Sequence, residues 1–512
     1  MWALILDFNF FQENKNWNMK KYQYSILGLA CIISMIVTSC KKSFLDIGPE
    51  ATINGSKFFS TEAEILQAVN GAYSTLRILG LNSYWVFGEM RSDNTANFQT
   101  NTGGEQRELI DQFLTIATND NVRAFWQQSY IGISRCNDVL DHIEPVVMAD
   151  NIKKRYIAET KYLRAFYYFQ LVRQFGGVPL RITSIQSPAN SLSGGRATKE
   201  VINSQIISDL NTAVADLPPS YSGKDLGRAT QGAARMMLAE VQMTQKKFAE
   251  ALVILQPLKN LGYSLLPNYK SIFDPKNKNN AESIFEIQYL GTQPTLASNF
   301  MYTFAPANSG SNVTADPGTS LSLTSGWNTP TTDLLNAYEA TDLRKAASFS
   351  LGYLNNGVFV SAPHVIKYNH GFVNRGNTDN NFPVYRYADA LLLIAECINE
   401  TAGVNAEAFD ILDKIRVRAG LEPVVRGSVT TQAQLKLAIE KERRLELAFE
   451  NHRWYDLVRT GRAVEVMNAH GIQEKILKPT VIRPAAFNVT QNNLLLPIPQ
   501  QEVSVDNLEQ NP

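Results

Sequence analysis

The chain has 512 residues and a formal net charge of zero, with 48 Lys and Arg against 48 Asp and Glu. Its composition, 44% hydrophobic and 19% charged, excludes a disordered chain and a protein with many membrane spans. Zero net charge argues against nucleic acid as a partner, because nucleic-acid-binding proteins normally carry a basic excess. The five histidines and four cysteines are scattered, so neither a metal site nor a bound cofactor is predicted.

The N-terminal segment has the layout of an export signal. A Lys20-Lys21 pair precedes the twelve-residue apolar run Ile26–Val37, which as a helix would span only about 18 Å of a roughly 30 Å bilayer core. Small residues then precede Cys40, which favours a bacterial lipobox in which Cys40 is acylated over a plain signal peptide with an accidental cysteine. We predict a lipoprotein signal peptide at 19–39.

Residues 1–18 do not fit the start of a signal peptide, because two acidic residues stand there among aromatic ones. We interpret them as a mis-called start, with translation beginning at Met19. The mature chain is then expected to be one unit, 40–512. Of its cysteines, Cys136 and Cys397 lie in helical stretches, which favours buried, unreactive thiols over a disulfide.

Most of the mature chain is predicted to be helical. Apolar residues recur at spacings of three and four, and connections such as 245–247 and 401–404 are short enough to make antiparallel hairpins. Small residues at the expected crossings favour tetratricopeptide-like helix pairs over a generic bundle. The predicted fold class is therefore predominantly all-α, with the helical scaffold at about 60–260 and 385–460. The predicted helices cover 61–79, 120–143, 153–175, 199–216, 229–245, 248–260, 386–400, 405–419, 431–449 and 451–459.

Two segments, 80–118 and 263–384, are predicted to be irregular. They are rich in Asn, Gly, Pro, Ser and Thr, with short β-like runs such as Ser283–Tyr289. Long irregular segments inside a helical protein are more often functional than idle. We therefore expect these two segments, with their few short strands, to carry function.

Common catalytic motifs do not occur in the sequence: GxGxxG, GxxxxGK[ST], GxSxG and HExxH are all missing. The carboxylate pairs Asp138 with Asp141 and Glu440 with Glu442 are expected on solvated helix faces. Spacing alone leaves open an acid/base pair assembled from distant loops. The chain is predicted not to be an enzyme.

Several segments carry recognisable motifs. They are Phe44-Leu45-Asp46, the helix Trp126–Leu140, Glu159–Phe169 with the following Phe175–Leu180, Arg386–Glu396, Glu442–Arg459 and Leu496–Glu502. These segments resemble one known family, the SusD/RagB-like outer-membrane lipoproteins of Bacteroidetes. The similarity covers essentially the whole mature chain in the right order, and the motifs are specific jointly.

This resemblance implies a lipid-anchored glycan-binding subunit, tethered through Cys40 to the outer membrane and facing the cell exterior. It would capture oligo- or polysaccharide and deliver it to a TonB-dependent β-barrel transporter of the SusC type. Some members of such systems bind peptides instead. Two competing hypotheses are a periplasm-facing tetratricopeptide scaffold and a surface hydrolase.

A glycan site needs aromatic platforms flanked by polar side chains. Trp126 and Trp454 belong to helix motifs and are expected to pack inside the protein. Arg453 and Asp456 are expected to hold the last helices together rather than to contact a ligand. Trp85 and Trp327 lie in the two irregular segments, and the resemblance implies that these segments, with their short strands, form the ligand face. The candidate ligand-binding residues are therefore Trp85, Arg91, Asp93, Asn94, Tyr302 and Trp327.

Overall fold

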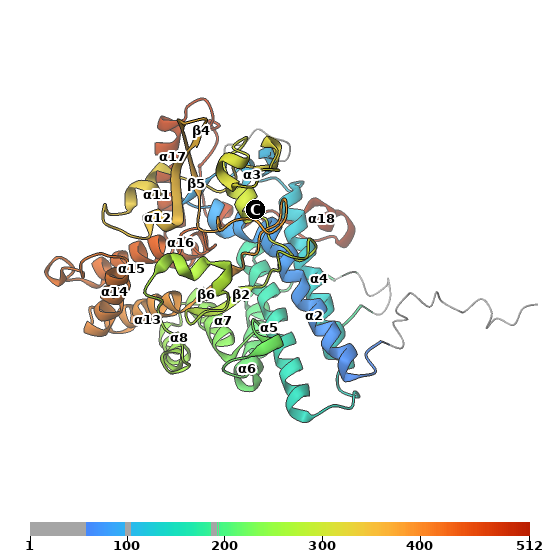
Figure 1. Ribbon diagram of the computed structural model, residues 1–512. Coiled ribbons are helices and arrows are strands. Elements are labelled where there is room, and N and C mark those ends of the chain that lie inside the picture. The colour runs from blue at the N-terminus through green and yellow to red at the C-terminus, as the bar shows by residue number, and fades with distance from the viewer. Residues whose placement is uncertain (1–57, 98–103, 186–191, 193) are drawn as a thin grey trace, which may run out of the picture. The chain divides into compact units, whose positions relative to one another are not determined.

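The computed structural model describes residues 58–97, 104–185, 192 and 194–512 (Figure 1). The predicted start site, signal peptide and acylated Cys40 lie outside these residues. Contacts divide the chain into two units, Met1–Ser60 and Thr61–Pro512, and the second is described below.

Long helices pack one against the next along the chain (Figure 1). Helix α2 packs on α4, α4 on α5, α5 on α6, α6 on α7 and α7 on α8, after which α8 meets α13 and α13 contacts both α14 and α15. This arrangement confirms the predicted tetratricopeptide-like scaffold. The bounds are α2 Glu62–Leu79, α4 Asp120–His142, α5 Asp150–Phe175, α6 Lys199–Asp216, α7 Gln231–Thr244, α8 Phe248–Leu255, α13 Tyr387–Ala402, α14 Ala406–Arg418 and α15 Gln432–Glu446.

Side chains at the helix starts explain where several helices begin. Thr61 opens α2 with a reciprocal capping box, in which its hydroxyl accepts from the amide of Glu64 and the Glu64 carboxylate accepts from the amide of Thr61. Helix α4 is capped by Asn119, whose side chain accepts from the amides of Asn121 and Val122. Asp120, the first residue in our prediction for this helix, is its first helical residue and not the cap.

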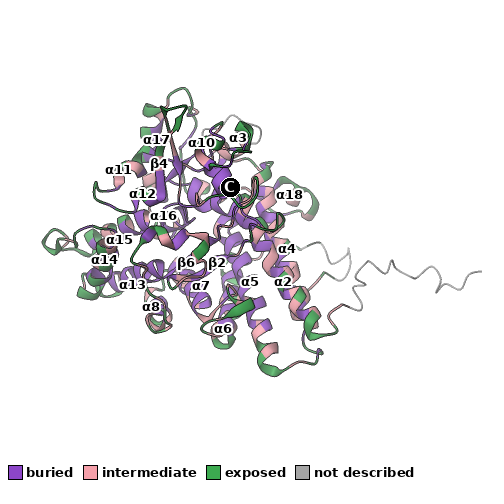
Figure 2. Ribbon diagram, in the orientation of Figure 1, coloured by how far each residue is buried: buried purple, intermediate pink, exposed green. Residues whose placement is uncertain are grey.

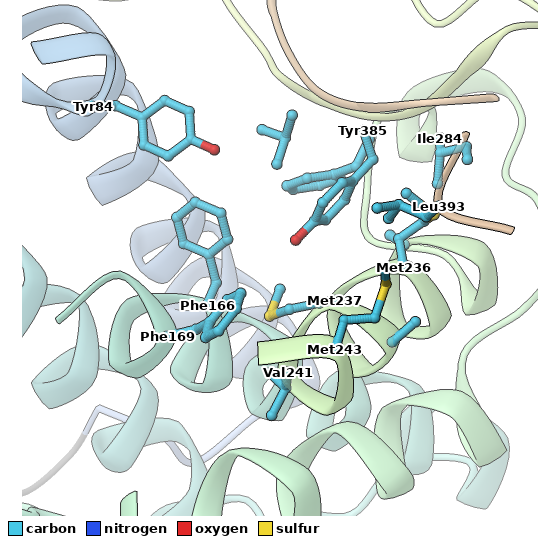
Figure 3. Close-up of a cluster of buried hydrophobic side chains, with 14 of the residues drawn as sticks. Tyr84, Phe166, Phe169, Met236, Met237, Val241, Met243, Ile284, Tyr385 and Leu393 are labelled. Carbon is cyan, nitrogen blue, oxygen red and sulfur yellow. The ribbon is translucent and has the colours of Figure 1, made fainter. Parts of the chain in front are cut away.

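Helix α5 lies at the centre of the scaffold and is buried along most of its length (Figure 2). Its aromatic residues Phe166 and Phe169 face a hydrophobic cluster that also contains Tyr84, residues of α7 such as Met237, and Tyr385 (Figure 3). Trp126 and Trp454 are also buried, so both helix-motif tryptophans lie in the core as predicted.

The segment 263–384 contains short strands and helices between irregular stretches. Strand β2 pairs antiparallel with β6, which leads directly into α13, and β1 pairs with β3. Strands β4 and β5 form a hairpin that the sequence analysis did not predict. The bounds are β1 Thr95–Ala96, β2 Ser283–Ile287, β3 Thr329–Pro330, β4 Phe349–Asn355, β5 Val358–Val365 and β6 Phe382–Arg386.

The remaining helices are mostly short and border the irregular stretches. One of them, α17, has 15 residues and was not predicted from the sequence. The bounds are α3 Gly104–Asp111, α9 Phe300–Phe304, α10 Ser311–Thr314, α11 Thr332–Ala337, α12 Lys345–Ser348, α16 Arg453–Thr460, α17 Ala463–Leu477 and α18 Gln500–Asp506.

Candidate functional site

The two tryptophans chosen from the irregular segments meet in the structure. The rings of Trp85 and Trp327 stack with their centroids 6.4 Å apart and an angle of 26° between their planes. Phe304 of α9 packs edge-on against Trp85 at 5.1 Å. The guanidinium of Arg107 on α3 lies 3.7 Å from the centre of the Trp327 ring, within cation–π range. We call Trp85, Arg107 and Trp327 the tryptophan stack.

Backbone structure on both sides holds this stack in place. Gly80–Tyr84 and Val86–Met90 form two π-helical turns that carry Trp85 inward, and its indole nitrogen donates to the carbonyl of Leu81 at 3.1 Å. On the other side, the amide of Trp327 donates to the carbonyl of Thr303 at 3.2 Å. Residues from distant parts of the sequence are thereby fixed next to one another.

The stack exposes only some of its members. Trp85 is 0% exposed, whereas Trp327 and Arg107 are half-buried. The expectation that Trp85 offers an open platform to a sugar is therefore wrong, because Trp327, Phe304 and the core enclose its ring. Trp85 instead supports Trp327, and Trp327 with Arg107 forms the accessible part of the stack. Burial lowers the pKa of Arg107 to about 10, so its guanidinium stays charged at neutral pH.

Two of the predicted ligand residues, Asp93 and Asn94, take part in buried polar contacts. Asp93 accepts two hydrogen bonds from Arg453, at 2.7 and 2.8 Å, and forms a further ion pair with Arg444. Burial alone would raise the pKa of Asp93, but these arginines hold it well below its usual range. Asn94 donates to Glu89 at 2.9 Å. The bonds of Asp93 tie the end of the 80–97 segment to the C-terminal helices.

Arg91 and Tyr302 are also buried and serve the packing. The Arg91 guanidinium lies over the ring of Trp454 at 4.6 Å, and burial lowers its pKa to about 9. The Tyr302 hydroxyl donates to Asp316 at 2.8 Å, which braces the irregular stretch after α9. Neither side chain, at 2% exposure, presents a surface to a ligand in this conformation.

Asp93 does, however, border a cavity of about 470 Å³ between α11, α15, α16 and α17. Its walls carry both signs of charge, with Asp333 and Glu440 facing Arg444, Arg453 and Arg462 among others. Such a lining suits a polar ligand that forms many hydrogen bonds better than an apolar one. His470 of α17 also lines the cavity, and its buried Nε2 has no hydrogen-bond partner among the described residues.

A second polar feature is a buried network of ion pairs, the charge cluster. It joins α14 and α15 to strand β6 and the irregular segment. Arg386 donates to Glu450 and Glu282, each at 2.6 Å, and to Glu446 at 3.1 Å. Burial would raise the pKa of Glu446, but Arg418, Arg386 and Arg344 lower it to about 2. The ion pairs link Arg344, Lys367, Arg386, Arg416 and Arg418 with Glu282, Asp342, Glu442, Glu446 and Glu450.

The position of Glu442 in this cluster shows that one prediction from the sequence is wrong. Glu442 was expected on a solvated helix face, but it is 2% exposed and pairs with Arg344 at 2.6 Å. The partner lies 98 residues earlier, so helix spacing could not show it. Arg453 and Asp456 have the structural roles expected of them, since Asp456 bonds Arg443 of α15 and Arg459 of its own helix.

The His, Cys, Asp and Glu side chains do not converge on a metal site in the part of the chain that the structure describes. Within the ranges that the structure describes, no group of three His, Cys, Asp or Glu side chains is placed to hold a metal ion. Cys136 and Cys397 are free and buried, and burial raises the pKa of the Cys397 thiol to about 12.

Comparison with known proteins gives the family. Residues 336–512 match a model described as "SusD family", and residues 43–243 match one described as "Starch-binding associating with outer membrane". The chain belongs to the SusD/RagB-like family. SusD-like protein P2 of Formosa agariphila is 25% identical over 95% of this chain and 97% of its own, and SusD-like protein P25 of the same species is 28% identical over 91% and 94%.

Solved structures agree with this assignment to the SusD/RagB-like family. A structure named "Laminarin binding SusD-like protein" is 27% identical, covers 88% of this chain and 99% of its own, and has a TM-score of 0.75. Surface glycan-binding protein A from Bacteroides uniformis is 26% identical over 88% and 99%, with a TM-score of 0.73. Nowhere in the described ranges does a helix combine the length and apolarity needed to cross a bilayer.

Proposed function

We propose that this SusD-like protein is a lipid-anchored, surface-exposed subunit that captures oligo- or polysaccharide and delivers it to a SusC-like TonB-dependent β-barrel transporter. The family descriptions support association with the outer membrane, and two related structures are named for glycan or laminarin binding. The observation that carries the proposal is the tryptophan stack, in which a half-buried indole packs on a second indole and has a guanidinium over its ring.

The stack suits a sugar for physical reasons. Pyranose rings present flat C–H faces that pack on indole, and Arg107 can donate hydrogen bonds to hydroxyls at the edge of the ring. Because Trp85 and the backbone bonds already fix Trp327, little side-chain entropy remains to be lost on binding. The role of the stack is therefore capture by stacking and hydrogen bonding, without a chemical step.

Affinity electrophoresis over a panel of polysaccharides, including starch and laminarin, tests the capture site. We expect Trp327→Ala to weaken retention by about tenfold, equivalent to about 1.4 kcal/mol. Phe248→Ala, which removes another half-buried aromatic at the start of α8, is the matched control and should bind like the wild type. Equal retention of Trp327→Ala and the wild type would show that the site lies elsewhere.

Localisation and anchoring need separate experiments. Protease treatment of intact cells should digest the protein if it faces the exterior. Protection until the outer membrane is broken would instead support the periplasm-facing scaffold. Cys40→Ala should move the protein from the membrane fraction to the soluble fraction if the cysteine carries the lipid. Hydrolysis of a bound polysaccharide by the purified protein would contradict a purely binding role.

A further inference from the structure

The β4–β5 hairpin is a tight two-stranded unit. Its strands are joined by Asn356-Gly357, both with positive φ, at 49° and 82°. This is the residue pair and the backbone region that a two-residue type I′ turn requires. Leu354 pairs directly with Phe359, and Asn355 with Val358, so the strands stay in register up to the turn.

The end of this hairpin is apolar and exposed. Leu354 is 62%, Val358 68% and Phe359 59% exposed, and no Asp, Glu, Lys or Arg occurs from Phe349 to Ile366. Proteins usually protect such free strands with charged residues and rarely leave neighbouring large apolar side chains uncovered. The hairpin therefore presents a surface that fits a binding role.

Phe359 is held in a defined position on this surface. A Cβ added to Gly352 on the adjacent strand would lie 2.6 Å from Cζ of Phe359, so the ring occupies the space above the glycine. Leu354, the direct partner of Phe359, lies on the same face of the hairpin. The glycine backbone supports the ring from below while more than half of the side chain stays open to solvent.

Strand β3 connects the hairpin to the segment that carries Trp327. Strand β5 packs beside β3, and β3 begins two residues after Trp327. On the other side, Asn355 at the end of β4 accepts a hydrogen bond from the Asn312 side chain of α10 at 3.4 Å. Both asparagines are exposed, but Asn355 pairs with Val358, so its side chain lies on the face of the hairpin opposite Phe359. Ser361, which pairs with Gly352, is exposed on the same face as Phe359, so a hydroxyl and an aromatic ring share that face, the combination a sugar requires.

We propose that Phe359 on the β4–β5 hairpin is a second sugar-stacking subsite, and that the ligand is a polysaccharide chain that contacts Trp327 and Phe359 at the same time. This inference rests on the glycan-binding function proposed above. A chain held at two places gains affinity because the second contact is made at a high effective concentration. An oligosaccharide too short to reach both places gains nothing from Phe359.

Chain-length dependence tests this subsite. Binding of laminarin and starch is measured by affinity electrophoresis, and binding of their trisaccharides by calorimetry. We expect Phe359→Ala to weaken polymer binding by about three- to tenfold and to leave trisaccharide binding unchanged. Phe359→Trp, which keeps a stacking face, should bind polymer at least as well as the wild type. Val253→Ala on α8, where Val253 is 74% exposed, is the control for loss of an exposed apolar side chain.

Each result decides between the two proposals. If Trp327→Ala weakens polymer binding and Phe359→Ala does not, the subsite is refuted and glycan capture stands, which would leave the hairpin as a contact for a protein partner. If Phe359→Ala weakens trisaccharide and polymer equally, the two-point contact is refuted. If the wild type binds no polysaccharide of the panel, both proposals are overturned. An unchanged thermal midpoint shows that each variant is folded.

Discussion

Replacing Arg386 by methionine should lower the free energy of unfolding by about 3–5 kcal/mol, because it leaves buried carboxylates without their partner. Arg386 is 1% exposed and donates five hydrogen bonds, to Glu282, Glu446 and Glu450. Methionine fills a similar volume, so the effect of packing stays small and the effect of charge dominates.

The size of the effect follows from the charge balance of the cluster. Its ion pairs join five cationic side chains to five carboxylates, so removing Arg386 leaves one negative charge uncompensated. Combining Arg386→Met with Glu450→Gln restores the balance and should recover part of the lost stability.

Urea denaturation followed by circular dichroism measures these differences as shifts in midpoint at constant slope. Arg123→Met is the matched control, because Arg123 forms an exposed pair with Asp120 on α4 and its loss should cost no more than about 0.5 kcal/mol. A loss for Arg386→Met below about 1 kcal/mol, or equal to that of the control, would refute the view that the cluster is dry and tightly coupled.

Three further predictions concern packing, acid stability and thiol reactivity. Gly132→Ala on α4 should destabilise the protein by about 1–3 kcal/mol, since the new methyl would lie 2.5 Å from Cζ of Tyr167. Gly71→Ala on α2, where the added methyl meets open space, should instead stabilise the protein by about 0.5–1 kcal/mol. Thermal melts compare the two variants, and equal shifts of the midpoint would contradict the close α4–α5 crossing. Glu446 has a pKa of about 2 in the folded protein and about 4.3 in the unfolded chain. Its ionised form therefore stabilises the folded protein above about pH 4.5, and this stabilisation is lost as the pH falls toward 2. Thermal melts from about pH 7 to 3 should therefore show a falling midpoint for the wild type and a shallower fall for Glu446→Gln. If the two midpoints fall in parallel, Glu446 is not the cause of the acid sensitivity. Buried Cys397 should resist a thiol reagent until the protein is denatured, and rapid reaction of the native protein would show that α13 opens.

Much of the helical scaffold could be predicted because its helices follow simple rules of spacing and capping. Helix α2 begins and ends where its apolar spacing and Thr61 place it. Helix α17 could not be found this way, since its buried face consists of Ala463, Met467, Gly471 and two polar residues, so the hydrophobic pattern is weak. The β4–β5 hairpin did carry a signal in its Asn356-Gly357 turn, which was masked by the irregular composition around it.

The candidate site was predicted less well, because exposure depends on tertiary contacts. Composition placed Trp85 and Trp327 together in candidate regions, and they do stack, but nothing local distinguishes the enclosed ring from the accessible one. Arg107 was missed since its role depends on a residue more than two hundred positions away. Asp93 was selected for its polar side chain, but its carboxylate is already engaged in ion pairs with Arg453 and Arg444.

The charge cluster also has a consequence for the order of folding. Arg344 pairs locally with Asp342, but its other two carboxylate partners, and the partner of Lys367, lie in 442–450, near the end of the chain. Until that stretch has arrived, these cations gain little by leaving water, and the segment that carries Phe349–Val365 cannot be locked in place. Contacts so distant in sequence slow folding. We therefore expect the α2–α8 helices to form early and the irregular segment to consolidate last, after the whole chain is available.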